Sequence, residues 1–181
     1  EAVRLEPQNP EGLIGRAGIY VRRGNFDAAI ADYNAAIKMQ PADPALYYNR
    51  GFSLFNKGEY EQALADYRRA IRLNPTLAPT YINACLAGAI IGKDYTRALA
   101  DCDKALQLTP RSLDAYDARA FVYLKMGDMA KARAEYEAAL KIDPTHARAI
   151  FGRGLARAKS GDKAGGDADM AVGLRSDPNL A

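Results

Sequence analysis

The residues of this chain best suited to catalysis are one histidine and two cysteines. His146 follows Pro144 and Thr145 in a stretch typical of a loop. A cysteine and a histidine act as nucleophile and base only when their side chains lie within hydrogen-bonding distance. Cys85 and Cys102 instead occupy apolar positions of the helical pattern described below, one repeat away from His146. We therefore predict that His146 is an exposed loop residue, and we predict no catalytic residues and no enzyme activity.

The sequence contains few residues that could bind a metal ion or a cofactor. Structural metal sites need several Cys or His ligands at short spacing, and the chain has one histidine and no such pair of cysteines. Gly165 and Gly166 do not follow a strand, so they do not predict a phosphate-binding loop. We predict no metal site and no cofactor. Cys85 and Cys102 are expected to be buried thiols, although their place in one repeat leaves a disulfide open if their Cα atoms are close.

The charge balance is too mild to indicate a polyanionic partner. The chain has 181 residues, with 25 Lys and Arg against 22 Asp and Glu, and a net charge of +3. The basic residues alternate with acidic ones, which is typical of solvated helix faces. No apolar run is long enough to cross a bilayer. We predict neither nucleic-acid binding nor membrane insertion, and two cysteines assign no redox compartment.

Prolines mark a regular period along the chain. Pro41, Pro75, Pro110, Pro144 and Pro178 follow one another at intervals of 34, 35, 34 and 34 residues. A period of this length indicates stacked helix–turn–helix units, each of which buries its apolar face only against its neighbours. The predicted fold class is therefore all-α, an α-solenoid of tandem helical hairpins.

The prolines also set the expected repeat boundaries within a single solenoid over residues 1–181. Residues 1–9 match the end of a preceding repeat, which suggests a piece of a longer protein, and the last of the five repeats is expected to be weak. The five predicted repeats are 10–43, 44–77, 78–112, 113–146 and 147–180.

The second repeat shows the helices best. A first helix is expected from about Ala45 to Lys57 and a second from about Tyr60 to Leu73, separated by a break at Gly58. Glycine at such a break adopts a left-handed conformation without steric cost. The same break recurs at Gly24, Gly92, Gly127 and Gly161.

Small residues alternate with large ones at the positions where paired helices must interlock. The small residues of the first helices are Ala17, Gly51, Cys85, Ala120 and Gly154, those of the second helices begin with Ala29, Ala63, Ala98, Ala132 and Gly166, and the large residues of the second helices are Tyr33, Tyr67, Cys102, Tyr136 and Met170.

These columns closely resemble the tetratricopeptide repeat (TPR) family over nearly the whole chain. The phrases Tyr48-Asn49-Arg50-Gly51 and Ala31-Asp32-Tyr33 are similar to its bacterial branch. The resemblance implies a right-handed superhelix whose first helices line a concave groove that binds partner peptides. A bacterial origin would leave cytoplasm and periplasm both open as the compartment.

Two places depart from the pattern. Gly88 replaces a large residue, which predicts a gap in the packing and a cost of about 1 kcal/mol relative to alanine. The second helix of the last repeat contains Gly165, Gly166 and Gly173, which predicts a weak terminal unit.

One column of arginines faces one column of acids in the pattern. Arg16, Arg50, Arg119 and Arg153 occupy equivalent positions on first helices, and Asp32, Asp66, Asp101, Glu135 and Asp169 occupy equivalent positions on second helices. The hypothesis is that the arginines pair with these acids inside the stack, because the planar guanidinium suits bidentate pairing. The alternative is an arginine ladder for an acidic ligand.

First-helix residues outside the packing columns are expected to face the groove, and Asp117 and Ala118 are among them. Most of these groove-facing residues are apolar, and a contiguous exposed apolar area marks an interaction site. The predicted peptide-binding residues are Tyr48, Asn49, Phe52, Phe55, Ile82, Asn83, Leu86, Phe121 and Leu124.

Asn49 and Asn83 resemble two rungs of the asparagine ladder by which TPR proteins hold extended peptides, although asparagine is also simply tolerated on an open helix face. The basic residues of a carboxylate clamp are absent beside them. The predicted function is a non-catalytic scaffold that binds a peptide or amphipathic segment of a protein partner. The alternatives are a recognition or regulatory arm of a larger multidomain enzyme and a solenoid that self-associates end to end.

Overall fold

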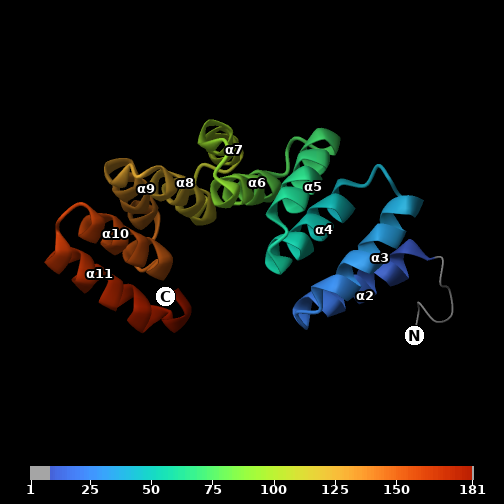
Figure 1. The fold of residues 1–181 in the computed structure, drawn as a ribbon, viewed down its shortest axis with the longest axis horizontal. Helices are drawn as coiled ribbons and strands as arrows, with labels where there is room; N and C mark the ends of the chain where they lie inside the picture. Colours follow the sequence, from blue (N-terminus) through green and yellow to red (C-terminus); the bar gives the residue numbers. More distant parts are fainter. Residues whose placement is uncertain (1–8, 181) are drawn as a thin grey trace. The chain divides into compact units, whose positions relative to one another are not determined.

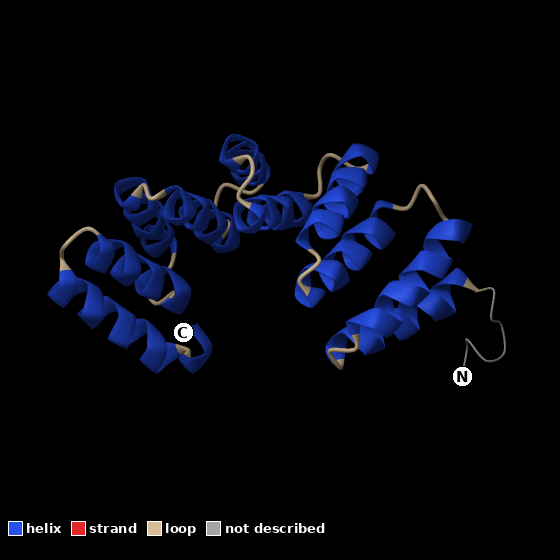
Figure 2. Ribbon diagram, in the orientation of Figure 1, coloured by secondary structure: helices blue, strands red, loops and turns tan. Residues whose placement is uncertain are grey.

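A computed structural model describes residues 9–180, and within this range it contains helices and no strands (Figure 2). The helices form consecutive pairs along the chain, followed by one short 3-10 helix (Figure 1). They are α2 (Pro10–Arg22), α3 (Phe26–Met39), α4 (Pro44–Lys57), α5 (Tyr60–Leu73), α6 (Ala78–Ile91), α7 (Tyr95–Leu108), α8 (Leu113–Met126), α9 (Met129–Ile142), α10 (Ala147–Lys159), α11 (Lys163–Ser176) and η1 (Pro178–Leu180).

Several helices begin and end where the sequence supplies capping residues. Asp43 accepts a hydrogen bond from the Ala45 amide at the start of α4, and Ser112 accepts one from Ala115 at the start of α8. Gly58, which follows α4, has a φ of 88°, a conformation that only glycine adopts without strain. The predicted glycine breaks are confirmed, because all five glycines have positive φ.

Each predicted repeat range from residue 10 onward holds one helix pair. The reading of residues 1–9 as the end of a preceding repeat falls almost entirely outside the described residues. The described residues form two compact units, one up to Ala87 and the other from Gly88 onward. The grouping of all repeats into a single solenoid stays a prediction.

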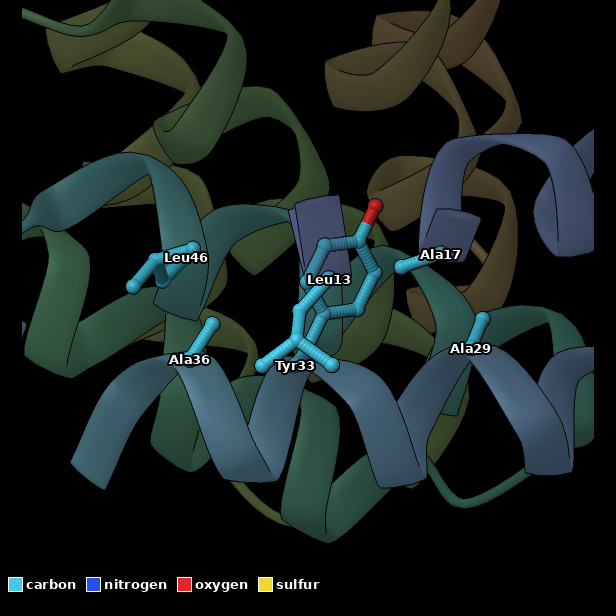
Figure 3. Packing of buried hydrophobic residues seen from close by; sticks show 6 residues of the cluster. All are labelled: Leu13, Ala17, Ala29, Tyr33, Ala36 and Leu46. Atoms are coloured by element: carbon cyan, nitrogen blue, oxygen red, sulfur yellow. The ribbon is translucent and has the colours of Figure 1, made fainter. Parts of the chain in front are cut away.

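The first unit is held together by apolar contacts within and between hairpins. Leu13 and Ala17 of α2 pack against Ala29, Tyr33 and Ala36 of α3 (Figure 3). The same cluster includes Leu46 of α4, which is 1% exposed. The core therefore continues from one hairpin to the next, as a repeat protein requires.

A second cluster joins α4, α5 and the first part of α6. Leu54, Ala63 and Tyr67 pack with Ala84 and Ala87. Gly51 of α4 makes this packing possible, since a Cβ atom there would lie 2.8 Å from the Tyr67 ring. The small and large residues that alternate in the sequence therefore contact each other across the paired helices.

In the second unit, glycines permit close helix approach and do not leave gaps. A Cβ atom at Gly154 of α10 would lie 2.7 Å from the backbone oxygen of Gly166 on α11. Gly88 is similar, because a Cβ atom there would lie 3.2 Å from that of Ala98. The predicted packing gap at Gly88 is therefore wrong, since the neighbouring helix fills it.

None of the described helices combines the length and apolar character needed to span a membrane.

Candidate functional site

Seven of the predicted site residues lie on α4 and α6 in the first unit. We call them the α4–α6 surface: Tyr48, Asn49, Phe52, Phe55, Ile82, Asn83 and Leu86. Phe52 is 38% exposed and the other six are half-buried.

A direct contact joins the two helices of this surface. The Asn83 side-chain amide donates to the Tyr48 hydroxyl at 3.4 Å. Residues 35 positions apart, which the repeat pattern assigns to one face, therefore meet in the structure. On α4, Tyr48, Phe52 and Phe55 follow one another at spacings of four and three, which places them along one side of the helix.

Two aromatic residues of the surface also stabilise the core beneath it. The Tyr48 ring lies 6.2 Å from the Tyr67 ring, and Phe55 meets Tyr60 edge to face at 5.2 Å. Both Tyr48 and Phe55 pack against the cluster around Tyr67. Phe52 is not part of that cluster. It is therefore the aromatic ring of the surface with the most area left for a partner.

The amides of the surface are partly engaged. Asn83 uses one donor on Tyr48, as described above. Asn56, one turn after Phe52, donates to the Phe52 backbone oxygen at 2.8 Å. Asn49 is half-buried, and its side chain has no hydrogen bond among residues 9–180. Its side chain can therefore both donate to and accept from another molecule.

The two remaining site residues lie on α8 in the second unit. Phe121 is half-buried and lies outside the core cluster there, whereas Leu124 packs against that cluster. The expectation that Asp117 and Ala118 face a groove is wrong, since the two residues are buried, with 6% and 1% of their surface exposed.

His146 and Asp117 form a partly buried contact that the sequence did not predict. His146 Nε2 lies 2.8 Å from Asp117 Oδ2, and the two side chains are 20% and 6% exposed. His146 does lie in the loop between α9 and α10, as predicted, but the prediction that it is exposed is wrong. Burial raises the pKa of the Asp117 carboxyl, and the bond to His146 opposes this effect. Asp117 occupies a repeat position that holds Ile14, Tyr48 and Ile82 in the earlier repeats. An acid at this otherwise apolar position was the signal that could have indicated a hydrogen-bond partner for Asp117.

The proposed pairing of arginines with acids is confirmed. Arg50 Nε and Nη2 donate to the two oxygens of Asp66 at 2.7 and 2.6 Å. Arg16 binds Asp32 in the same bidentate way. Arg153 binds Asp169 through two bonds of 2.8 Å, and Arg119 donates to Glu135 at 2.7 Å. These arginines are occupied within the protein, which argues against an arginine ladder for an acidic ligand.

Two of these arginines also reach the preceding hairpin. Arg50 Nη1 donates to Asn34 Oδ1 of α3 at 2.7 Å, and Arg119 Nη1 donates to Asp103 Oδ1 of α7 at 2.6 Å. Each guanidinium therefore joins three helices, its own, the following one and the preceding one.

The two cysteines are not the buried thiols that the sequence led us to expect. Cys85 and Cys102 are fully buried, but both are disulfide-bonded, and no free cysteine occurs among the described residues. Within the same residues no group of three or more His, Cys, Asp or Glu side chains is arranged to hold a metal ion.

Comparison with family models assigns both halves of the chain to one family. A tetratricopeptide repeat model matches residues 1–78 and a second one matches residues 86–149. The chain belongs to the tetratricopeptide repeat family, whose members are generally non-catalytic scaffolds that bind protein partners. A comparison with curated proteins finds no match.

Solved structures of bacterial TPR proteins share this fold. A tetratricopeptide repeat protein from Parabacteroides merdae is 23% identical with a TM-score of 0.86, over 97% of this chain and 69% of that one. MamA is 24% identical with a TM-score of 0.75, over 93% and 92% of the two chains. YrrB, described as a TPR protein with an unusual peptide-binding site, is 17% identical with a TM-score of 0.71, over 98% and 91%.

Proposed function

We propose that this chain is a non-catalytic scaffold that binds a peptide or amphipathic segment of a protein partner on the exposed faces of its first helices. The α4–α6 surface of the first unit is the main contact, and Phe121 and Leu124 of α8 are a separate candidate contact in the second unit. The observation that carries the proposal is the exposure of Phe52 on a helix face that also carries Asn49.

The chemistry of this surface favours an apolar side chain next to peptide groups. A large aromatic ring at the centre of an interface contributes roughly 2 kcal/mol or more to binding. Asn49 has a donor and an acceptor available, which match the N–H and C=O groups of a peptide backbone. The surface therefore offers one apolar anchor and one backbone-binding group on adjacent turns of α4.

The ion pairs made by the arginines favour a ligand without acidic groups. The guanidinium groups of Arg16, Arg50, Arg119 and Arg153 each bind an acid of the protein itself. An acidic peptide would have to displace bonds of 2.6 to 2.8 Å to reach them. The fold is also that of YrrB, whose structure is described as containing a peptide-binding site.

The test is selection of binders from a display library of random dodecapeptides on the full chain, followed by affinity measurement with the tightest peptide. Phe52→Ser should lower the affinity roughly tenfold or more, because the anchor is lost. Val172→Ser on α11 is the matched control, since Val172 is also apolar and 38% exposed. It should leave the affinity unchanged.

Two results would contradict the proposal. One is a selection that yields no peptide binder to the folded chain. The other is an equal loss of affinity in the Phe52 and Val172 variants. This would mean that the peptide binds exposed apolar residues non-specifically.

A further inference from the structure

One face of α2 is exposed, although the equivalent face of every later first helix is buried. Ile19 is 41% exposed. The residues at its repeat position in α4, α6, α8 and α10 are each 0% exposed, and they are Ser53, Ala87, Val122 and Ala156. Gly12, two turns before Ile19, is half-buried. Its equivalents are at most 1% exposed, and they are Leu46, Thr80, Ala115 and Ala149.

The contact that α2 lacks is with a preceding second helix. Leu46 of α4 belongs to the cluster that contains Ala36 of α3. Ala149 of α10 likewise packs with Ala139 of α9. Among residues 9–180, no helix precedes α2 that could cover its corresponding face. An isoleucine is therefore exposed at a position where the other repeats bury their residue.

The same face carries a guanidinium nitrogen that is available for a further bond. Arg16 Nε and Nη2 bind the second helix of its own hairpin, and Nη1 makes no hydrogen bond within the described part of the chain. Arg50 Nη1, by contrast, donates to Asn34 of the preceding helix at 2.7 Å. Arg119 Nη1 donates to Asp103 of its preceding helix at 2.6 Å. The Arg16 side chain is accordingly 41% exposed, against 23% for Arg50 and 21% for Arg119.

The helix that packs on α4 shows what chemistry suits this face. Ile30 and Ile37 of α3 pack against clusters that contain residues of α4, and Asn34 lies between them. The spacings of four and three place the three residues on one side of the helix. The second helix that packs on α8 has the same pattern at the equivalent positions Leu99, Asp103 and Leu106. The pattern is a short acceptor between two apolar residues.

A longer acid at the central position does not make this contact. Glu137 of α9 holds the position of Asn34 and Asp103, and it pairs with Arg133 of its own helix. The following arginine, Arg153, binds only acids within its own hairpin. The pattern therefore requires Asn or Asp as the acceptor.

A second copy of this chain does not supply the required helix. α11 has Ala171 at the acceptor position and Asp167 at the position of Ile30. Two α2 faces placed together would bring Arg16 against Arg16, with like charges and no acceptor on either side. The exposed face therefore favours a helix from a different protein.

We propose that the α2 surface, formed by Gly12, Arg16 and Ile19, docks an amphipathic helix of a protein partner. This helix carries Asn or Asp, with an apolar residue four positions before it and another three positions after it. The Asn or Asp accepts from Arg16 Nη1, and the apolar residues cover Gly12 and Ile19. The α2 surface shares no residue with the α4–α6 surface and is additional to it.

The probe is a capped peptide with the sequence of α7, Tyr95–Leu108. α7 packs on α8, whose residues at the three positions also follow the order small, arginine and large apolar. Cys102→Ala removes the thiol from the peptide. An amide bridge between Thr96→Glu and Ala100→Lys, which are exposed positions of α7, holds the short peptide helical. Circular dichroism verifies the helix, and fluorescence anisotropy with the full chain gives the dissociation constant.

Three variants of the chain and one of the peptide test the contact. Ile19→Ser should raise the dissociation constant about tenfold, because the apolar contact is lost. Asp103→Ala in the peptide should also raise it about tenfold, because Arg16 loses its acceptor. Met39→Ser is the matched control, since Met39 is likewise 41% exposed but lies on α3. Met39→Ser and Phe52→Ser should leave the affinity unchanged.

Three results would overturn the α2 surface. One is that the helical probe does not bind the full chain. Another is a loss of affinity in Phe52→Ser but not in Ile19→Ser, which would place the peptide on the α4–α6 surface and support the proposed function alone. The third is a dimer of the chain in sedimentation equilibrium that Ile19→Ser dissociates, since a second copy would then cover this face.

Discussion

Arg50 binds Asp66 through two hydrogen bonds, from Nε at 2.7 Å and from Nη2 at 2.6 Å, across the pair α4–α5. The same guanidinium reaches Asn34 on the preceding hairpin. Asp66 is buried at 8% side-chain exposure, and Arg50 is 23% exposed. The pair therefore stabilises both the hairpin and its junction with the hairpin before it.

Replacing Arg50 should destabilise the fold. Arg50→Ala leaves the buried Asp66 carboxylate without a partner, a change that costs about 3–5 kcal/mol for a fully buried pair. Partial exposure of Arg50 reduces this, and we expect a loss of about 2 kcal/mol in the free energy of unfolding. Urea denaturation followed by circular dichroism measures it.

Arg69→Ala is the matched control for this experiment. Arg69 is exposed, and its guanidinium lies 5.6 Å from the centre of the Tyr47 ring, so its loss should cost at most about 1 kcal/mol. If Arg50→Ala melts at the wild-type temperature, the pairing does not stabilise the stack.

Asp117→Asn should change how stability depends on pH. The folded-state pKa of Asp117 is raised by burial above its unfolded value of about 3.9. The folded protein therefore holds this proton more tightly than the unfolded chain, and stability falls as the pH rises from about 4 through the folded-state pKa. The asparagine of the variant has no titrating carboxyl group. The free energy of unfolding of the variant, relative to that of the wild type, should therefore rise as the pH increases from about 4 through the folded-state pKa of Asp117.

Denaturation of both proteins from pH 3.5 to 8 gives this difference directly. Other carboxylates act in the opposite sense and cancel in the comparison, for example Asp143, whose pKa is lowered by hydrogen bonds from Thr145. A constant difference between the two proteins across the range would contradict the raised pKa.

Alanine at two helical glycines should have opposite effects. Gly154→Ala places a Cβ atom 2.7 Å from the Gly166 backbone oxygen and 2.8 Å from the Met170 backbone nitrogen. The backbones must separate, at a cost of about 1–3 kcal/mol. Gly15→Ala on α2 meets nothing within 4 Å and should raise stability by up to about 1 kcal/mol through helix propensity. Thermal melts of the two variants check both signs, and a stabilising Gly154→Ala would rule out the close contact.

Removing two aromatic rings should weaken partner binding with little effect on folding. Phe52→Ala combined with Phe121→Ala should lower peptide affinity at least tenfold, because both anchors are lost. Neither ring belongs to the described clusters around Tyr67 and Tyr136. Calorimetric titration gives the affinity, and the urea midpoint should shift by less than the loss expected for a core ring, about 3–5 kcal/mol. A large loss of stability would place the rings in the core.

Periodic features of this protein were predictable from the sequence. The limits of α5 at Tyr60 and Leu73 and the left-handed Gly58 were predicted because the glycine before the helix and Asn74 and Pro75 after it act locally. The pairing of Arg50 with Asp66 was also predicted, since both residues recur in register with the repeat. A pattern repeated several times in one chain reports on tertiary contact as well as on local structure.

Contacts that occur once were not predictable in this way. His146 and Asp117 meet at a single junction, 29 residues apart, so no second repeat reports the pairing. Gly88 was interpreted as a gap because the equivalent positions of other repeats hold large side chains, whereas the position of Ala98 decides the packing.

The most direct test of peptide binding is a crystal structure of the full chain with the peptide selected from the dodecapeptide library. The account predicts that the peptide lies on α4 and α6, with an apolar side chain against Phe52 and its backbone beside Asn49. A peptide bound instead to the outer faces of α3 and α5, with Phe52 uncovered, would contradict it.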